Sequence, residues 1–137
     1  MATVIRAEVS EKNKYWISKH RHYELKHFCL QYSSWEKAYE ELTGFNGRSD
    51  ESGSRSSLPG DPTGKCVELR SVYLDRMNLV RNTAFEADPI LGEYIFKAVT
   101  EELSYTYLRN KLNIPCGRDM YYDRYRRFFW LLSKSRN

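Results

Sequence analysis

Apolar side chains recur at helical spacing through most of the chain, and this periodicity limits its possible folds more than any other feature. The longest example lies within residues 66–84, where an apolar residue follows every three or four positions. It comprises Cys66, Leu69, Tyr73, Met77, Val80 and Ala84. No segment alternates for long between apolar and polar residues, as a half-buried strand would. We therefore predict an all-α protein with six helices, built as a small helical bundle.

Two Asp-Pro pairs mark helix starts after residue 60. Asp61-Pro62 and Asp88-Pro89 each place a capping residue before a proline, whose fixed backbone angle suits the first helical turn. The first pair predicts a long helix to about residue 86, and the second predicts a shorter helix with an apolar inner face. The long helix carries a continuous apolar stripe that suits packing against another long helix. We expect it to form the seam of a homodimer.

The first 43 residues are expected to form two helices. Ser18 is placed to cap a helix that runs to about residue 31. Ser34 is placed to cap a second helix over residues 35–43, which Gly44 is expected to end.

Residues 44–64 stand out by composition and divide the chain. Glycine and serine dominate this segment, which would bury too little apolar surface to offset the entropy of ordering it. We expect a mobile linker here. It would separate an N-terminal helical segment (residues 1–43) from a helical core (residues 65–137).

Basic residues concentrate towards the end of the given sequence. The whole chain has a formal net charge of +4, and residues 109–137 hold eight basic and two acidic residues. A basic end on a slightly acidic remainder favours contact with a polyanion.

The same basic stretch has the pattern of a helix-turn-helix over about residues 104–133. Ser104 is placed to cap a short helix that Asn113 ends, because asparagine tolerates the left-handed backbone conformation. Ile114 is the apolar plug expected where two such helices cross, and a longer helix follows from about residue 118. In proteins with this motif, the second helix enters the major groove of DNA.

A helical wheel of the last helix separates an inner face from a charged face. Tyr121, Tyr125, Phe128 and Leu132 fall within about 40° of one direction, so we expect them to pack in the core. Trp130 points outward on this wheel and is expected to pack on another helix or on a second subunit.

The charged face is expected to meet phosphates and base edges. The expected DNA-binding residues are Arg109, Lys111, Arg118, Tyr122, Asp123, Arg126 and Arg127. Asp119 and Asp123 either accept hydrogen bonds from cytosine or hold Arg118, Arg126 or Arg127 in place, and helical spacing favours the second role.

Several stretches carry a likeness to known proteins. They are residues 17–26, 61–63, 85–89, 97–101 and 114–129. Together they resemble prophage-encoded transcription regulators of the RinA and ArpU type, and the helix pair is similar to the C-terminal helix-turn-helix of sigma-factor region 4. These resemblances imply a phage-type DNA-binding regulator with Tyr122, Asp123 and Arg126 at base-reading positions. Its turn is longer than the family's usual one.

Two other functions remain open on the sequence. The basic aromatic helix could contact an acidic surface of host RNA polymerase, another host protein or a nucleoprotein, so that the protein acts as an inhibitor or adaptor. Alternatively, the same motif could belong to a DNA-packaging component that forms a ring.

The remaining features do not favour catalysis, a cofactor, a metal or a membrane segment. No Gly-rich loop follows a predicted strand, and His20 and His22 would point about 200° apart on a helix. No histidine lies near Cys116 in sequence. No apolar run approaches the roughly 18 residues of a membrane helix. We therefore expect a non-enzymatic cytoplasmic protein with double-stranded DNA as its main partner and without cofactor, metal or membrane contact.

Overall fold

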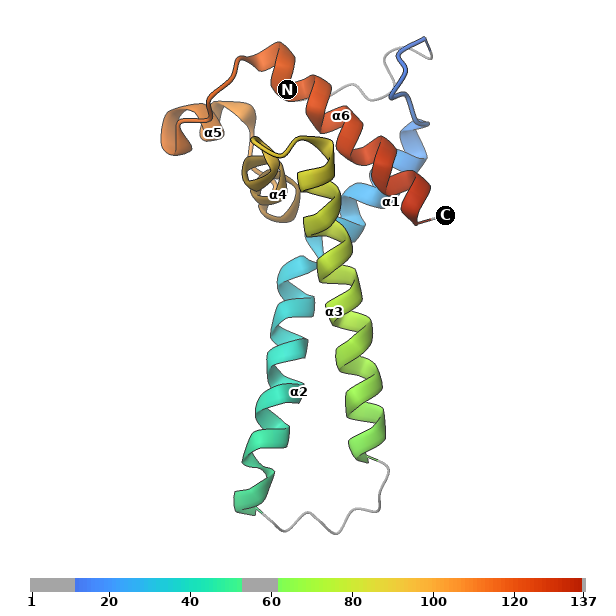
Figure 1. Ribbon diagram of the computed structural model, residues 1–137, viewed down its shortest axis with the longest axis vertical. Coiled ribbons are helices and arrows are strands. Elements are labelled where there is room, and N and C mark those ends of the chain that lie inside the picture. Colours follow the sequence, from blue (N-terminus) through green and yellow to red (C-terminus); the bar gives the residue numbers. More distant parts are fainter. Residues whose placement is uncertain (1–11, 53–61, 137) are drawn as a thin grey trace. The chain divides into compact units, whose positions relative to one another are not determined.

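The computed structural model describes residues 12–52 and 62–136, which form six α-helices and no β-strand (Figure 1). The helices are α1 (Lys19–Leu30), α2 (Tyr32–Ser52), α3 (Pro62–Ala87), α4 (Gly92–Glu101), α5 (Tyr105–Leu112) and α6 (Arg118–Ser135). The all-α prediction is confirmed. Within the described residues, no helix combines the length and the apolar character that crossing a bilayer requires.

The described residues divide into two compact units. Unit 1 contains residues 12–31 and 79–136, and unit 2 contains residues 32–52 and 62–78. Unit 1 therefore holds α1, α4, α5, α6 and the last turns of α3, whereas unit 2 holds α2 and the rest of α3. These bounds differ from the division at residues 44–64, because α3 contributes to both units. Residues 53–61 of the expected linker lie outside the described residues.

α2 begins earlier and ends later than the sequence predicted. It runs from Tyr32 to Ser52, so a cap at Ser34 and an end at Gly44 are both wrong. A glycine inside a helix costs only about 1 kcal/mol relative to alanine. It also keeps the backbone N–H that a proline lacks, so it weakens a helix without ending it. The first proline after this helix is Pro59.

The other predicted helix limits agree with the structure more closely. Ser18 caps α1, because its Oγ accepts a hydrogen bond from the backbone N–H of Arg21 at 3.3 Å. α3 starts at Pro62 and ends at Ala87, close to the predicted end. Asp61, the expected cap of α3, lies outside the described residues.

The core of unit 1 forms where α6 packs against α1 and α4. Its largest fully buried side chains are Leu25, Cys29, Val80, Leu91, Ile95, Leu108, Tyr121, Phe128, Phe129 and Leu132. The inner face predicted for α6 is therefore confirmed, with Tyr125 half-buried at its edge.

Aromatic and polar contacts join α1 to α6. The ring of His22 on α1 lies 4.8 Å from the ring of Phe129, edge to face. Arg21 donates from Nε to Ser133 Oγ and from Nη2 to the backbone oxygen of Ser133, both at 3.0 Å. These contacts fix α6 against α1.

The connection between α3 and α4 brings the Phe85 ring directly against the backbone of Gly92. A Cβ built on Gly92 would lie only 2.4 Å from Cδ1 of Phe85, which is closer than atoms can approach. Arg81 stabilises the same corner, since its guanidinium lies 4.3 Å from the ring centre of Phe96 and 3.5 Å from the Glu93 carboxylate. The first residue of α4 must therefore lack a side chain for Phe85 to keep its place.

We predict that Gly92→Ala lowers the free energy of unfolding by about 1–3 kcal/mol, because the added methyl group must displace Phe85. Urea unfolding followed by circular dichroism measures this loss. Gly64→Ala, in α3, is the matched control. No atom lies within 4 Å of its Cβ position, so it should stabilise the helix by up to about 1 kcal/mol. Equal stability of the wild type and Gly92→Ala would contradict the steric argument.

Candidate nucleic-acid interface

The helix-turn-helix pattern corresponds to α5, a turn over residues 113–117, and α6. Ser104 Oγ accepts a hydrogen bond from the backbone N–H of Tyr107 at 3.1 Å, which caps α5 as predicted. Asn113 has the predicted left-handed conformation (φ 55°, ψ 47°). Ile114 is buried, and its N–H donates to the backbone oxygen of Leu108 at 3.1 Å. The local features expected of the turn are therefore present.

Tyr105 holds the longer turn against the start of α6. Its hydroxyl donates to the backbone oxygen of Cys116 at 2.7 Å, and its ring lies 5.5 Å from the ring of Tyr121. The guanidinium of Arg118 lies 5.0 Å from the centre of the Tyr105 ring. Burial, with the nearby Asp88 carboxylate, raises the pKa of the Cys116 thiol above its usual value. The thiol therefore stays protonated, which is unfavourable for a nucleophile.

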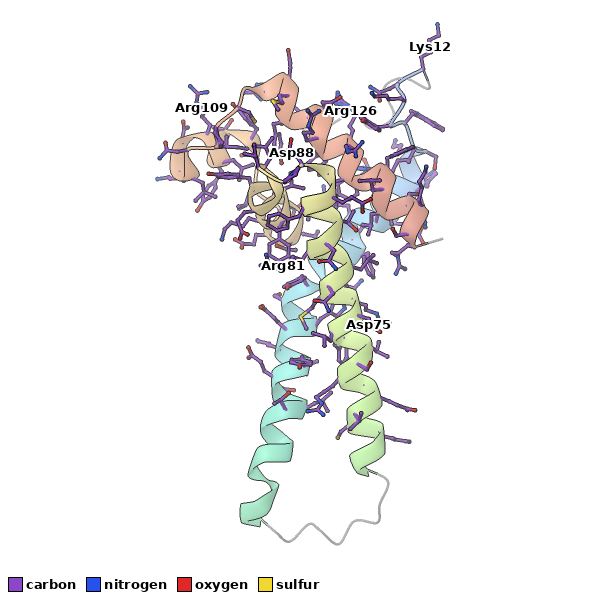
Figure 2. All side chains as sticks on the ribbon, viewed as in Figure 1. Lys12, Asp75, Arg81, Asp88, Arg109 and Arg126 are labelled. Carbon is purple, nitrogen blue, oxygen red and sulfur yellow. The ribbon has the colours of Figure 1, made fainter. Side chains whose placement is uncertain are left out.

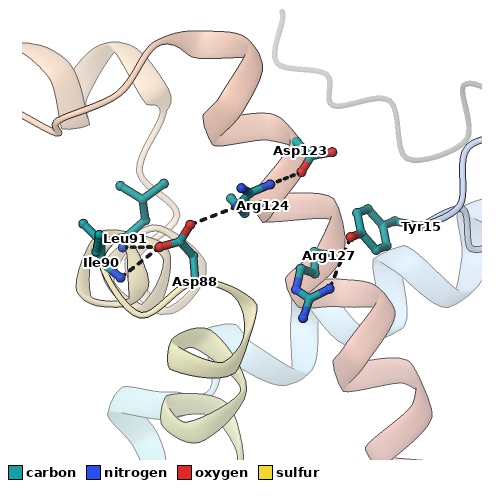
Figure 3. A network of polar contacts seen from close by, with 7 residues as sticks. All are labelled: Tyr15, Asp88, Ile90, Leu91, Asp123, Arg124 and Arg127. Atoms are coloured by element: carbon teal, nitrogen blue, oxygen red, sulfur yellow. Dashed lines mark hydrogen bonds and ion pairs between the residues drawn. The ribbon is translucent and has the colours of Figure 1, made fainter.

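Asp88 joins the start of α4 to α6 (Figure 3). Its Oδ1 accepts hydrogen bonds from the backbone N–H groups of Ile90 (2.8 Å) and Leu91 (3.0 Å). Its Oδ2 accepts one from Nε of Arg124 at 2.9 Å. Asp88 thus caps a turn rather than the helix itself, which begins at Gly92. Burial alone would raise the pKa of Asp88, but these hydrogen bonds and the Arg124 charge hold it below its usual value.

Asp123 pairs with Arg124, which also contacts Asp88 (Figure 3). The expectation that Asp123 holds Arg118, Arg126 or Arg127 is therefore wrong. Adjacent residues on a helix usually point apart, but the long Arg124 side chain lies between the two carboxylates and reaches both. Asp119 is exposed and forms no ion pair within the described part of the chain.

The first turns of α6 are the part of its outer side that stays accessible. Arg118, Asp119 and Met120 are exposed, whereas Tyr122, Asp123 and Arg126 are half-buried. Arg126 donates from Nη1 to the backbone oxygen of Tyr122 at 3.2 Å, so its side chain lies back along the helix.

α5 adds two further cations, because Arg109 and Lys111 are both exposed. Figure 2 shows Arg109 on α5 and Arg126 on α6, within the same compact unit. Neither these two α5 residues nor Arg118 and Arg126 form an ion pair with any described acidic residue. These four residues, and Arg127, which bonds to the neutral Tyr15 hydroxyl, therefore keep a charge that no described ion pair neutralises.

At Arg127 and Trp130, the chain itself covers part of the outer side of α6. Arg127 donates from Nη1 to the Tyr15 hydroxyl at 3.2 Å (Figure 3). The Tyr15 ring lies 5.3 Å from the ring of Trp130, and Tyr15 is only 9% exposed. Trp130 was expected to pack on another helix or on a second subunit, but it packs on Tyr15, which precedes α1 and lies in no helix. The outer side of α6 is thus open at its first turns and again at Lys134, and Tyr15 covers the part between them.

Among the residues that the structure describes, no three His, Cys, Asp or Glu side chains are grouped in a way that could hold a metal ion.

No family model matches the chain, and neither a curated protein nor a solved structure is similar to it. The likeness to RinA and ArpU regulators therefore rests on the stretches quoted above. The function must be argued from the geometry of α5, the turn and α6.

We predict that Asp88→Asn lowers the free energy of unfolding by about 1–3 kcal/mol at neutral pH, because the amide cannot replace the charged partner of Arg124. The pKa of Asp88 is lower in the folded protein, so its contribution is present above its ordinary pKa and is lost as the pH falls through the folded value.

Urea unfolding at a series of pH values tests both effects. The stability of Asp88→Asn should fall less steeply than that of the wild type as the solution is acidified. Asp75→Asn, at an exposed position of α3, is the matched control and should retain the wild-type pH profile. Parallel profiles for the wild type and Asp88→Asn would refute the role of this carboxylate.

Proposed function

We propose that the chain is a non-enzymatic, phage-type regulator of transcription that binds double-stranded DNA through α6. The observation that carries this proposal is the open outer side of the first turns of α6, next to a firmly held turn. A helix that presents its N-terminal residues beyond such a turn is suited to enter the major groove. The resemblance to RinA and ArpU regulators supports a role in transcription.

The accessible side chains suit contacts with base edges. Arg118 and Arg126 can each donate two hydrogen bonds to guanine or to a backbone phosphate, and Tyr122 offers a ring edge and a hydroxyl. Met120, which the sequence pattern did not single out, is 43% exposed and can contact a thymine methyl group. Its exposure on the first turn of α6 is the only feature that indicates such a contact for Met120.

Arg109 and Lys111 on α5 suit contacts with phosphates, which position a protein on DNA without reading its sequence. Together with Arg118 and Arg126, they would neutralise about four phosphates. The affinity should then fall about a hundredfold between roughly 50 and 200 mM salt.

We also propose that the protein binds DNA as a homodimer joined through α3, since one such motif reads few base pairs. Of the predicted α3 stripe, Met77, Val80 and Ala84 are buried, whereas Leu69 is 46% exposed. The large apolar side chains exposed on this helix within unit 2 are Val67, Leu69, Val72 and Leu74.

The positions of these four residues are symmetric about the midpoint between residues 70 and 71. An antiparallel pair of α3 helices would therefore place Val67 against Leu74 of a second copy, or Leu69 against Val72. Such self-complementarity is what a two-fold interface requires. This symmetry favours a second copy of the chain over an unrelated partner as the occupant of the surface.

We predict that Arg118→Ala combined with Arg126→Ala weakens binding to a mixed-sequence duplex of about 20 base pairs and lowers the slope of log affinity against log salt by about 2. Fluorescence anisotropy over a salt series measures both quantities. Lys37→Ala combined with Lys65→Ala removes the same charge from exposed sites of unit 2 and should leave binding unchanged. Equal losses in both double variants would show net charge rather than a defined interface.

We predict that the wild-type protein sediments at twice the chain mass of 16.3 kDa. Leu69 and Val72 lie on one side of the helix, and Val67 and Leu74 lie on the other. Glutamate at both residues of the pair that forms the seam should return the protein to the monomer, because a charge on an apolar seam is not solvated, and glutamate at the other pair should not. Asp75→Lys, at an exposed polar position between the two sides of the same helix, is the control. A monomeric wild type at micromolar concentration would rule out the dimer, and a much larger mass would favour a ring.

A further inference from the structure

The contact between residues 12–18 and α6 forms a second basic surface that the helix-turn-helix motif does not include. Tyr15 is its anchor, with its ring packed on Trp130 and its hydroxyl bonded to Arg127. Cations surround this aromatic pair. Lys134 Nζ lies 3.8 Å from the ring centre of Trp130, and Lys14 Nζ lies 5.1 Å from that of Tyr15.

The local fold of residues 12–18 keeps these cations in place. The side-chain oxygen of Asn13 accepts a hydrogen bond from the backbone N–H of Tyr15 at 2.8 Å, and its backbone oxygen accepts one from Trp16 at 3.0 Å. Lys12 and Lys14 are both exposed on this turn, and Lys134 is exposed on α6. Figure 2 shows Lys12 pointing away from the helices. Lys14 and Lys134 therefore present their ammonium groups next to a fixed aromatic pair.

The length of α6 determines what this surface would meet. The helix has 18 residues, so it is about 27 Å long, more than twice the roughly 12 Å width of the major groove. When its first turns lie in the groove, its last turns must extend past the groove edge. A phosphate backbone borders the groove there. Lys134 belongs to these last turns, and Tyr15, with Lys14 over its ring, packs against them.

We propose that Lys14, Lys134 and Arg127, assembled on the Tyr15–Trp130 pair, form a second phosphate-binding surface that holds the DNA backbone next to the groove entered by α6. This inference rests on the proposed function, because it assumes that α6 docks on a duplex. It adds a contact that follows from the position of residues 12–18 on α6. The partner is the phosphodiester backbone, so the contact contributes affinity and orientation without reading the base sequence.

Lys14→Ala combined with Lys134→Ala tests the proposal on the full chain, with the mixed-sequence duplex as probe. The slope of log affinity against log salt should fall by about 2, while preferences among duplex sequences stay as in the wild type. The control is again Lys37→Ala with Lys65→Ala. An unchanged slope in a protein that still binds through Arg118 and Arg126 would overturn this inference and leave the proposed function standing.

Tyr15→Ala provides a second test that does not remove a charge. Loss of the anchor should weaken binding severalfold, and adding Lys14→Ala to Tyr15→Ala should then change the salt slope by much less than Lys14→Ala does alone. Tighter binding by Tyr15→Ala would mean that residues 12–18 obstruct the DNA, which also overturns the inference. Thermal unfolding by circular dichroism confirms that each variant is folded. If the wild type binds no duplex, the proposed function fails, and this inference fails with it.

Discussion

The packing of one face of α6 against α1 and α4 determines what the rest of unit 1 can do. Tyr121, Phe128, Phe129 and Leu132 have almost no contact with solvent, so the helix has only one rotation that buries them all. That rotation turns Arg118 and Arg126 outward and places the preceding turn beside Tyr105. A one-residue change in register would rotate the helix by about 100°, which would expose part of the aromatic row and bury guanidinium groups. The cost of such a rotation fixes the direction of the charged face.

Two cations of α6 and α1 stabilise this arrangement instead of facing a ligand. Arg124 is committed to Asp88 and Asp123, and Arg21 to Ser133. The basic excess of residues 109–137 therefore overstates the charge available at the first turns of α6. A carboxylate such as Asp88, which is 9% exposed, needs its partners, because an unpaired charge in that position would be costly. Part of the net charge is thus structural.

The sequence predicted the features that depend on neighbouring residues and missed those that depend on distant ones. The caps at Ser18 and Ser104 and the left-handed Asn113 follow from local chemistry, and the structure has all three. By contrast, Arg124 and Asp88 are 36 residues apart, and Arg127 and Tyr15 are 112 apart. Tyr15 belongs to no helical pattern, so periodicity could not assign it a place. The wrong prediction that α2 ends at Gly44 has a different origin. Glycine only weakens a helix, so the position at which α2 ends depends on the whole segment.

Under the proposed function, the division of cations along α6 separates affinity from specificity. Only a few groups, such as Arg118 and Arg126, can reach base edges. The other exposed cations are placed to contact phosphates, and they are Arg109, Lys111, Lys14 and Lys134. Phosphate contacts bind any duplex and weaken steeply with salt. A single motif of this composition would therefore bind many sequences with similar strength. Discrimination then has to come from a second copy at a fixed spacing, because two half-sites multiply the number of base pairs that are read. The short base-reading surface of α6 therefore requires a second copy of the chain, and the exposed apolar residues of α3 offer a surface through which two copies can pair.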